Sequence, residues 1–172
     1  MGAWSGWYRG LSKPEPYGDT RSYEIAAEFL ADCATVEDWG SGKGFFRTLR
    51  PDVLNVDGTR SPLVDIVTDL RCRHSRADGI LLRHVLEHNY DWQAILDNAA
   101  ASAHRKLCVV LFTPCAPRTH QIAFTDDLGV PDLSFALGDL LVRLVHFDTK
   151  TERIESATQY GEETIIRCLR SV

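Results

Sequence analysis

The clearest chemical pattern in the chain is a set of three glycines, Gly40, Gly42 and Gly44, which follow a short apolar run at 36–39. Alternating glycines let the backbone approach a flat or bulky ligand, and a helix that begins behind them offers unpaired N–H groups to an anion. A plain strand-to-helix turn without a ligand produces the same pattern, so the glycines by themselves are a weak signal.

Acidic residues end the next two apolar runs, Asp57 after 53–56 and Asp69 after 64–68. A carboxylate at the end of the second strand accepts hydrogen bonds from the vicinal hydroxyls of a ribose. Asp57 stands 57 − 38 = 19 positions after Asp38, which is close to the spacing of a ribose-binding acid. Together with the glycines, these acids predict a site for a ligand that contains a nucleoside.

The spacing departs from that of dinucleotide-binding proteins. A GxGxxG motif would place its third glycine at position 45, which is Phe45, and no tyrosine has a lysine four positions later as in short-chain reductases. A ligand with a ribose and a carboxylate but no pyrophosphate fits these residues better. A nucleotide-dependent oxidoreductase is a third alternative, against which Phe45 and the missing tyrosine–lysine pair both argue.

Three histidines, His84, His88 and His120, are candidates for a general base, because histidine titrates near neutral pH. Each follows the fourth or fifth apolar run, and we favour His88. A histidine that only packs or caps a helix is an equally good explanation for any one of them. We expect no metal site, because the sequence has neither HExxH nor a closely grouped set of ligands.

Longer elements must position these residues. The continuous apolar runs 79–82 and 106–112 are typical of strands buried on both faces, and 19–33 and 91–103 have helical periodicity. This alternation predicts a doubly wound, Rossmann-like α/β fold with a mostly parallel sheet in a compact three-layer arrangement. The carboxyl ends of parallel strands meet at one edge, so we expect the glycine loop, both acids and His84 to converge there.

The end of the chain predicts an antiparallel hairpin, from 152–159 and 164–169 on either side of Gly161. Residues 115–133 are expected to form an irregular loop, followed by a helix. We expect Asp132 or Ser134 to cap that helix, whose apolar positions are Phe135, Leu137, Leu140, Leu141, Leu144 and Val145.

Residues 1–18 are rich in glycine, proline and aromatic residues, which predicts an arm or lid on a single domain at 19–172. The link of about eight residues between the second and third apolar runs is too short for the usual crossover helix. We expect the arm and the 115–133 loop to select the acceptor, since both are long and irregular. The polar side chains of that loop suit a hydroxylated or sugar-like compound.

Composition excludes several classes of protein. The 172 residues carry 19 Lys+Arg and 24 Asp+Glu, a net charge of −5, so we expect no nucleic-acid partner. The 5 cysteines form no CxxC pair, which argues against a disulfide framework or a zinc ribbon and suits a reducing cytoplasmic location. The sequence shows no signal peptide and no run long enough to span a membrane.

The chain resembles the class I S-adenosylmethionine-dependent methyltransferases. Residues 36–44 resemble the first motif of that family, Asp57 matches its ribose-binding acid, and 68–70 resemble its adenine-contacting segment. The sequence HisValLeuGluHis at 84–88 is similar to one that these enzymes often carry after the fourth strand. The resemblance covers mainly 36–114, and the final hairpin is similar to the antiparallel sixth and seventh strands of the family.

The resemblance implies S-adenosylmethionine as cofactor. Asp38 would orient the glycine loop and approach the methionine ammonium, Asp57 would hold the ribose, and Asp69 with Leu70 would contact the adenine. The implied cofactor-binding residues are Asp38, Gly40, Ser41, Gly42, Gly44, Asp57, Gly58, Asp69, Leu70 and His84.

The implied function is transfer of a methyl group to a small polar acceptor, such as a hydroxylated or sugar-like compound. His88, His84 or His120 would serve as base where the acceptor is protonated. Two alternatives stay open. One is a cofactor-binding or regulatory module with reduced catalysis, which the short connections favour, and the other is a methyltransferase of a macromolecule.

Overall fold

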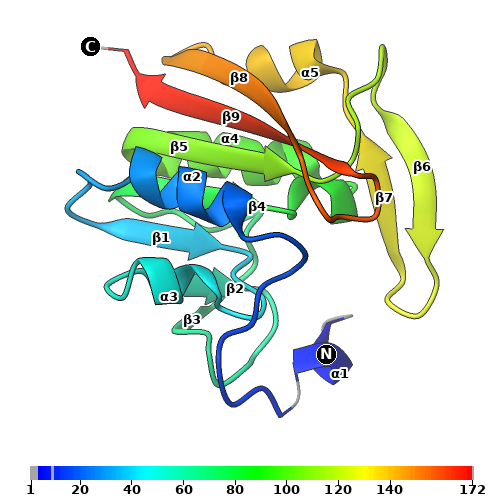
Figure 1. The fold of residues 1–172 in the computed structure, drawn as a ribbon. Coiled ribbons are helices and arrows are strands. Elements are labelled where there is room, and N and C mark those ends of the chain that lie inside the picture. The colour runs from blue at the N-terminus through cyan, green and yellow to red at the C-terminus, as the bar shows by residue number, and fades with distance from the viewer. Residues whose placement is uncertain (1–3, 9, 172) are drawn as a thin grey trace.

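The structure is a computed structural model that describes residues 4–8 and 10–171. Its main feature is a seven-stranded sheet with the order β3-β2-β1-β4-β5-β9-β8 (Figure 1). The strands are β1 Val36–Trp39, β2 Leu54–Asp57, β3 Ile66–Val67, β4 Ala77–Arg83, β5 Ala103–Leu111, β8 Phe147–Glu155 and β9 Glu162–Arg170. Strands β1 to β5 pair in parallel, whereas β9 is antiparallel to both β5 and β8.

Helices cover both faces of this sheet, with α2 on one face and α4 on the other (Figure 1). The helices are α1 Ser5–Tyr8, α2 Arg21–Phe29, α3 Phe46–Leu49, the 3-10 turn η1 Leu86–His88, α4 Trp92–Ser102 and α5 Leu137–Leu141. Ala26 and Phe46 pack in the core on the α2 side, while Leu96 and Leu140 pack in the core on the α4 side. The predicted doubly wound, three-layer α/β fold with a terminal antiparallel hairpin is confirmed.

The central strands form where the sequence predicted continuous apolar runs. In β4, Leu81 belongs to the core under α2, whereas Ile80 and Leu82 belong to the core under α4. Successive side chains of a strand point to opposite faces, and both faces are covered, so each position must be apolar. Burial on both faces makes β4 and its neighbours a rigid base for the loops at their carboxyl ends.

The connection from β2 to β3 runs through residues 58–65 in turns and bends, as the short spacing predicted. Side-chain bonds hold it in place. The amide of Asn55 donates to the Leu63 carbonyl at 2.8 Å, and the carboxylate of Asp65 accepts from the Asn55 backbone N–H at 2.8 Å. These bonds replace the packing that a crossover helix would supply.

The expected loop at 115–133 is wrong in its second half, because residues there form a hairpin of β6 His120–Thr125 and β7 Val130–Ser134. Gly129 adopts a φ of +64° in the turn, and its N–H donates to the Thr125 carbonyl at 2.8 Å. The turn residues obscured two short strands in the sequence, since Thr, Asp and Gly also dominate irregular loops.

The expected helix cap is wrong for the same reason, because Asp132 and Ser134 lie inside β7. The hydroxyl of Ser134 donates to the Pro114 carbonyl at 2.5 Å, and α5 begins only at Leu137. The helix then ends at Leu141, and Val145 is exposed. Its apolar spacing was real, but the chain leaves the helix before Val145 to enter β8.

The terminal hairpin is longer than predicted, since β8 begins at Phe147 rather than at 152. The first half of β8 is a polar, exposed edge strand and therefore carries no alternating apolar signal. Helix α2 is shorter than predicted, ending at Phe29 before a turn that brings the chain to Cys33. Within the described ranges, no helix has the length and apolar character needed to cross a bilayer.

Candidate functional site

A cavity of about 810 Å³ opens at the carboxyl ends of β1, β2 and β4. Its lining combines residues of the glycine loop, the ends of these strands, the N-terminal arm and the β6–β7 hairpin. A cavity of this size accommodates a small molecule or cofactor, and this edge is where open α/β sheets bind ligands. The strand ends therefore come together as expected, and they line one cavity.

The glycine loop follows β1 and forms one wall of this cavity. Gly40 and Gly42 adopt φ values of +77° and +50°, a region that side chains rarely tolerate. A Cβ at Gly40 would lie 2.3 Å from Cγ2 of Val85 in the turn after β4. The loop therefore needs glycine at position 40 both for its backbone conformation and for its close approach to the neighbouring strand end.

Asp57 ends β2 and is held by two backbone N–H groups. Gly42 donates to its Oδ2 at 3.0 Å and Thr59 to its Oδ1 at 2.7 Å. Burial raises the pKa of the Asp57 carboxyl, and these N–H donors oppose the shift. Each carboxylate oxygen keeps a second lone pair, so the group can still accept hydrogen bonds from a diol in the cavity.

Asp38 is a buried carboxyl that lines the cavity and has no hydrogen bond from the other described residues. Burial raises its pKa to about 7, although the nearby Arg83 guanidinium acts in the opposite direction. The hydroxyl of Ser41, also in the cavity wall, is buried without a partner in the described chain. Both groups would gain from a polar ligand, and a cation beside Asp38 would stabilise its charge.

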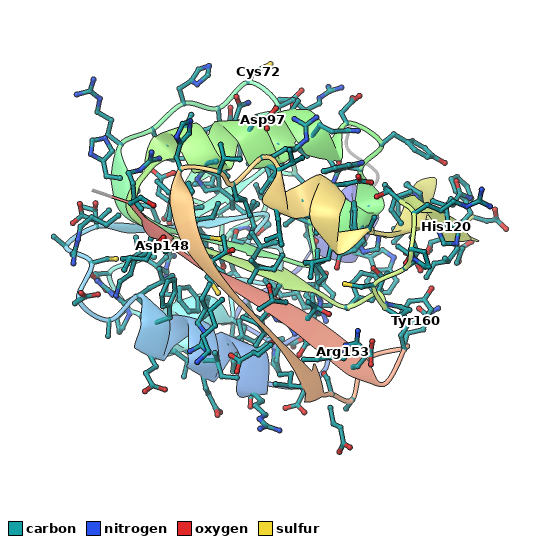
Figure 2. All side chains as sticks on the ribbon, turned by 90° about the horizontal axis from the view of Figure 1, so that it is seen from above. Cys72, Asp97, His120, Asp148, Arg153 and Tyr160 are labelled. Carbon is teal, nitrogen blue, oxygen red and sulfur yellow. The ribbon has the colours of Figure 1, made fainter. Side chains whose placement is uncertain are left out.

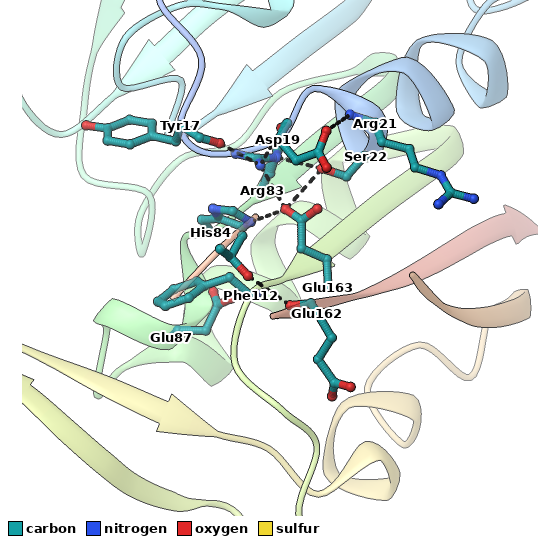
Figure 3. Close-up of polar contacts among 11 residues, drawn as sticks. Tyr17, Asp19, Arg21, Ser22, Arg83, His84, Glu87, Phe112, Glu162 and Glu163 are labelled. Atoms are coloured by element: carbon teal, nitrogen blue, oxygen red, sulfur yellow. Dashed lines mark hydrogen bonds and ion pairs between the residues drawn. The ribbon is translucent and has the colours of Figure 1, made fainter. Parts of the chain in front are cut away.

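Arg83, His84 and Glu163 form a network, with Arg83 and Glu163 buried, that the sequence did not predict (Figure 3). One carboxylate oxygen of Glu163, at the start of β9, accepts from Arg83 at 2.8 Å and lies 2.6 Å from Nε2 of His84. Ser22 donates to the same oxygen at 3.1 Å. The only sequence signal was the presence of charged residues at the ends of apolar runs, which does not identify their partners.

This network decides the state of His84. Burial lowers its pKa to about 4, so the imidazole is neutral at physiological pH and its Nε2–H donates to Glu163. Burial alone would raise the pKa of Glu163, but the bond from His84 and the charge of Arg83 hold it below its usual value. His84 also has a φ of 56°, a strained conformation that places its ring beside the cavity.

His88 lies in η1, and two hydrogen-bond acceptors lie close to its Nδ1 atom. Its Nδ1 is 3.0 Å from the Pro131 carbonyl and 3.2 Å from Oδ1 of Asp132, while Tyr160 donates to Oδ2 of Asp132 at 3.0 Å. Because both neighbours of Nδ1 are acceptors, Nδ1 carries the proton and Nε2 keeps its lone pair. Burial lowers the pKa of His88, so this neutral form dominates near pH 7. His88 lines the cavity and can accept a proton there.

The other predicted site residues differ in their placement. His120 is exposed on β6, at the periphery of the molecule (Figure 2), with its Nδ1 3.0 Å from the Arg118 carbonyl. Gly58 and the buried Leu70 line the cavity. Asp69 also lines it but is paired with Arg71 at 2.6 Å. Two of the three candidate histidines therefore meet at the cavity, and the third lies apart from it.

No protein-family model and no curated protein matches the chain. Solved structures do match. One is 1,6-didemethyltoxoflavin-N1-methyltransferase from Burkholderia thailandensis with 1,6-didemethyltoxoflavin and S-adenosylhomocysteine bound, which has a TM-score of 0.70 at 18% identity, over 88% of this chain and 77% of its own.

Two further structures have similar scores. Magnesium protoporphyrin IX methyltransferase from Synechocystis PCC 6803, with bound S-adenosylhomocysteine, has a TM-score of 0.64 at 16% identity over 88% of this chain and 83% of its own. The N-methyltransferase NodS from Bradyrhizobium japonicum WM9 has a TM-score of 0.64 at 12% identity over 100% of both chains. The chain therefore has the fold of class I S-adenosylmethionine-dependent methyltransferases, as the sequence predicted.

Proposed function

We propose that this protein, with the fold of those methyltransferases, is an S-adenosylmethionine-dependent methyltransferase of a small polar acceptor. The observation that carries the proposal is the joint placement of Asp38, Asp57 and the glycine loop around one cavity. Asp38 matches the ammonium of this cofactor and Asp57 matches its ribose diol. The glycine loop lets the backbone come close to the bound cofactor. The cofactors bound in the structural neighbours support the same assignment.

The unsatisfied groups of the cavity test whether the cofactor fits. The carboxyl of Asp38, which has no hydrogen bond from residues 4–8 and 10–171, would pair with the methionine ammonium. The remaining lone pairs of Asp57 would accept from the ribose hydroxyls. Leu70 offers an apolar surface to the adenine, with Asp69 beside it. The bound cofactor supplies a methyl group already activated by a sulfonium. The residues present therefore fit the group, and His84 adds a neutral imidazole to the same wall.

The protein's own contribution is to align the acceptor, to exclude water and to remove a proton. Methyl transfer is an in-line displacement, so positioning supplies much of the rate. We assign the proton to Nε2 of His88, because that nitrogen keeps its lone pair and the ring lines the cavity. The part of the predicted arm that the structure describes, residues 4–8 and 10–18, would act as a lid, since Trp4, Trp7 and Tyr8 contribute to the lining. Residues 1–3 and 9 of the predicted arm lie outside the described residues.

The acceptor is proposed to be a small molecule because the arm and the β6–β7 hairpin both contribute side chains to the wall of a cavity of about 810 Å³. Structural neighbours with small-molecule substrates agree with this assignment. A module that binds the cofactor without turnover is the second candidate, favoured by the short connections between β2, β3 and β4.

Calorimetric titration with S-adenosylmethionine and S-adenosylhomocysteine, with NAD and ATP as controls, tests the cofactor. We expect binding of both adenosyl compounds and neither control. Preference for NAD or ATP would overturn the proposal. Release of S-adenosylhomocysteine in an acceptor screen then separates an enzyme from a binding module, since a module would bind the cofactor without releasing this product.

A further inference from the structure

We propose that β8 is the interface of a symmetric dimer, in which the outer edges of two β8 strands pair antiparallel and join both sheets into one. The partner is a second copy of this chain. The inference does not depend on the proposed methyl transfer, because none of the residues of β8 lines the cavity.

Strand β8 occupies one edge of the seven-stranded sheet, with β9 as its neighbour on one side (Figure 1). Residues 148–151 of this strand are exposed. Among residues 4–8 and 10–171, no strand pairs with its outer side. An edge strand presents a row of unpaired backbone N–H and C=O groups, which is a template for another strand. The outer side of β8 is therefore able to accept one.

The other strand edges carry features that discourage pairing, and β8 lacks them. Strand β3, at the opposite edge of the sheet, is only two residues long. The β6–β7 hairpin has a shift in register between Gln121 and Ala123, and Pro131 lies in β7. Strand β8 is nine residues long, pairs with β9 in an unbroken register and contains no proline. Only its charged side chains remain to oppose pairing, so their pattern decides whether two copies can meet.

The backbone of β8 has a defined outer row. Beyond one end of the strand, the N–H of Ser156 donates to the Gly161 carbonyl at 3.0 Å. Beyond the other end, the N–H of Ser171 donates to the His146 carbonyl at 3.0 Å. Bonded positions alternate along an antiparallel ladder, and the register between these two bonds is unbroken. Even-numbered residues of β8 therefore bond to β9, whereas odd-numbered residues, with Thr151 at the centre, direct N–H and C=O groups outward.

These outward residues must pair with one another, which restricts the possible registers. When the two-fold axis passes through Thr151, the central residue, each strand is paired along all nine of its residues. Lys150 then lies directly opposite the partner's Glu152, and symmetry makes this pair occur twice. Thr149 lies opposite the partner's Arg153. In this register, no two like charges face each other directly.

The neighbouring registers bring like charges together. An axis at Lys150 would place Lys150 opposite its own copy and Asp148 opposite Glu152, while an axis at Glu152 would place Glu152 opposite its own copy. Like charges directly opposite each other destabilise a sheet, and opposite charges stabilise it. Like-charged diagonal neighbours in the full-length register lie farther apart, at about 7 to 8 Å instead of about 5 Å. Larger shifts leave four or more of the nine residues of each strand unpaired.

The charged groups at the centre of β8 are available to a partner. Lys150 is exposed and has no acidic partner in the part of the chain that the structure describes. Glu152 is bonded within its own chain, with Oε1 2.9 Å from Nη2 of Arg167. Its second carboxylate oxygen can accept from the Lys150 ammonium of a second copy. The interface therefore pairs a free cation with a carboxylate that has capacity left.

Sedimentation equilibrium of the whole chain over a range of concentrations tests for the dimer. A single strand pair is a small interface, so we expect a dissociation constant of about 1 to 100 μM at low salt. Association should weaken at high salt, because salt screens exposed charge pairs. A protein that is still monomeric at about 1 mM would overturn the proposal.

Charge reversal tests the register. Lys150→Glu and Glu152→Lys should each weaken self-association about tenfold or more, because each places two like-charged pairs across the interface. An equimolar mixture of the two variants should form a dimer again, since each Lys of one chain then faces a Glu of the other. Arg76→Glu, an equal change of charge at an exposed position before β4, is the control and should leave association unchanged. A dimer that Lys150→Glu leaves intact, or a mixture of folded variants that stays monomeric, would overturn the proposed register.

Hydrogen exchange on the unaltered protein locates the interface without any substitution. The outward amides of Thr149, Thr151 and Arg153 should exchange severalfold more slowly above the dissociation constant than below it, because they become bonded to the partner strand. The amides of Leu54 and Val67, near the opposite edge of the sheet, should show no such dependence. A dimer that leaves exchange in β8 unchanged would overturn the assignment of this strand as the interface.

Discussion

The carboxylate of Asp132 lies 3.2 Å from Nδ1 of His88, and the hydroxyl of Tyr160 donates to its other oxygen at 3.0 Å. The three residues come from β7, η1 and the turn between β8 and β9. A carboxylate behind an imidazole holds the ring in one tautomer and stabilises the imidazolium that forms when the ring takes a proton. The β6–β7 hairpin, which the sequence did not predict, therefore positions the base that we propose.

Asp132→Asn should lower kcat by about 100-fold or more, in the range of a general base that has lost its support, with little change in cofactor affinity. Burial lowers the pKa of His88, and the charge of Asp132 partly opposes this effect. Removing the Asp132 charge should therefore lower the pKa of His88 further and shift the acidic limb of the kcat/KM profile to lower pH. The measurement is a pH–rate profile with an acceptor that the screen for S-adenosylhomocysteine release has found. Asp148→Asn, at an exposed position on β8, is the control, and an unshifted limb would remove Asp132 from this role.

His88→Ala should slow turnover strongly and leave S-adenosylhomocysteine binding within about threefold, since the ring is proposed to act on the acceptor. His120→Ala should have no effect on either, because that side chain is exposed on β6. Single-turnover rates and calorimetry on both variants separate the two roles. Equal rates for the two variants would show that neither histidine is the base.

Asp57→Ala should weaken cofactor binding by about 1 to 3 kcal/mol, the usual cost of leaving buried hydrogen-bonding groups without a partner. The variant also frees the N–H groups of Gly42 and Thr59, so part of the loss reflects a less ordered glycine loop. Calorimetric titration with S-adenosylhomocysteine measures the change. Asp65→Ala is an informative comparison, because it loosens the same connection without touching the cavity; an equal loss for both would mean that Asp57 acts only on the loop.

Asp38 should make stability and cofactor affinity depend on pH in opposite directions. Its pKa is raised to about 7 by burial, so the native state without ligand holds a proton that the unfolded chain has lost above about pH 4. Stability from this group is thus present at low pH and lost as pH rises towards 7, by at most about 1.4 kcal/mol per pH unit. The charged form binds an ammonium, so cofactor affinity should fall as pH drops below about 7.

Asp38→Asn should flatten both dependences. The variant should be more stable than the original protein near pH 8 and should bind S-adenosylhomocysteine more weakly there, a loss of function for a gain in stability. Urea unfolding and calorimetry across this pH range measure the two effects. A variant that is less stable at high pH would contradict the assignment of a desolvated, ionised Asp38.

Gly40→Ala and Gly129→Ala separate a steric clash from backbone strain. Both glycines have φ near +60 to +80°, at +77° and +64°, so each substitution costs about 1 to 2 kcal/mol in backbone strain. Only at position 40 would the new Cβ meet another atom, Cγ2 of Val85 at 2.3 Å, which should cost a further 1 to 3 kcal/mol or so. Urea unfolding of both variants tests the difference. Equal losses would show that the loop can move away from Val85.

The sequence by itself was sufficient for the central architecture. Continuous apolar runs predicted β4 and β5, and glycines with an acid after the next run predicted the positions of Gly40 and Asp57 at one edge of the sheet. The predicted strands depend on the apolar pattern of neighbouring side chains, and the glycine loop depends on the backbone freedom of glycine. The common edge follows because the carboxyl ends of parallel strands lie at the same edge of a sheet. They remain visible in a single chain because each lies within a few residues.

Only the tertiary structure decided which charged side chains meet. Glu163 reaches Arg83 and His84 across about 80 positions, and Asp132 reaches His88 across 44, so neither pair has a signal in local periodicity. The arm is a similar case, since its aromatic residues could pack on any apolar surface until the cavity exists. Burial then sets the protonation of these groups, because a pKa depends on what surrounds a side chain in space, and that is settled only when distant segments come together.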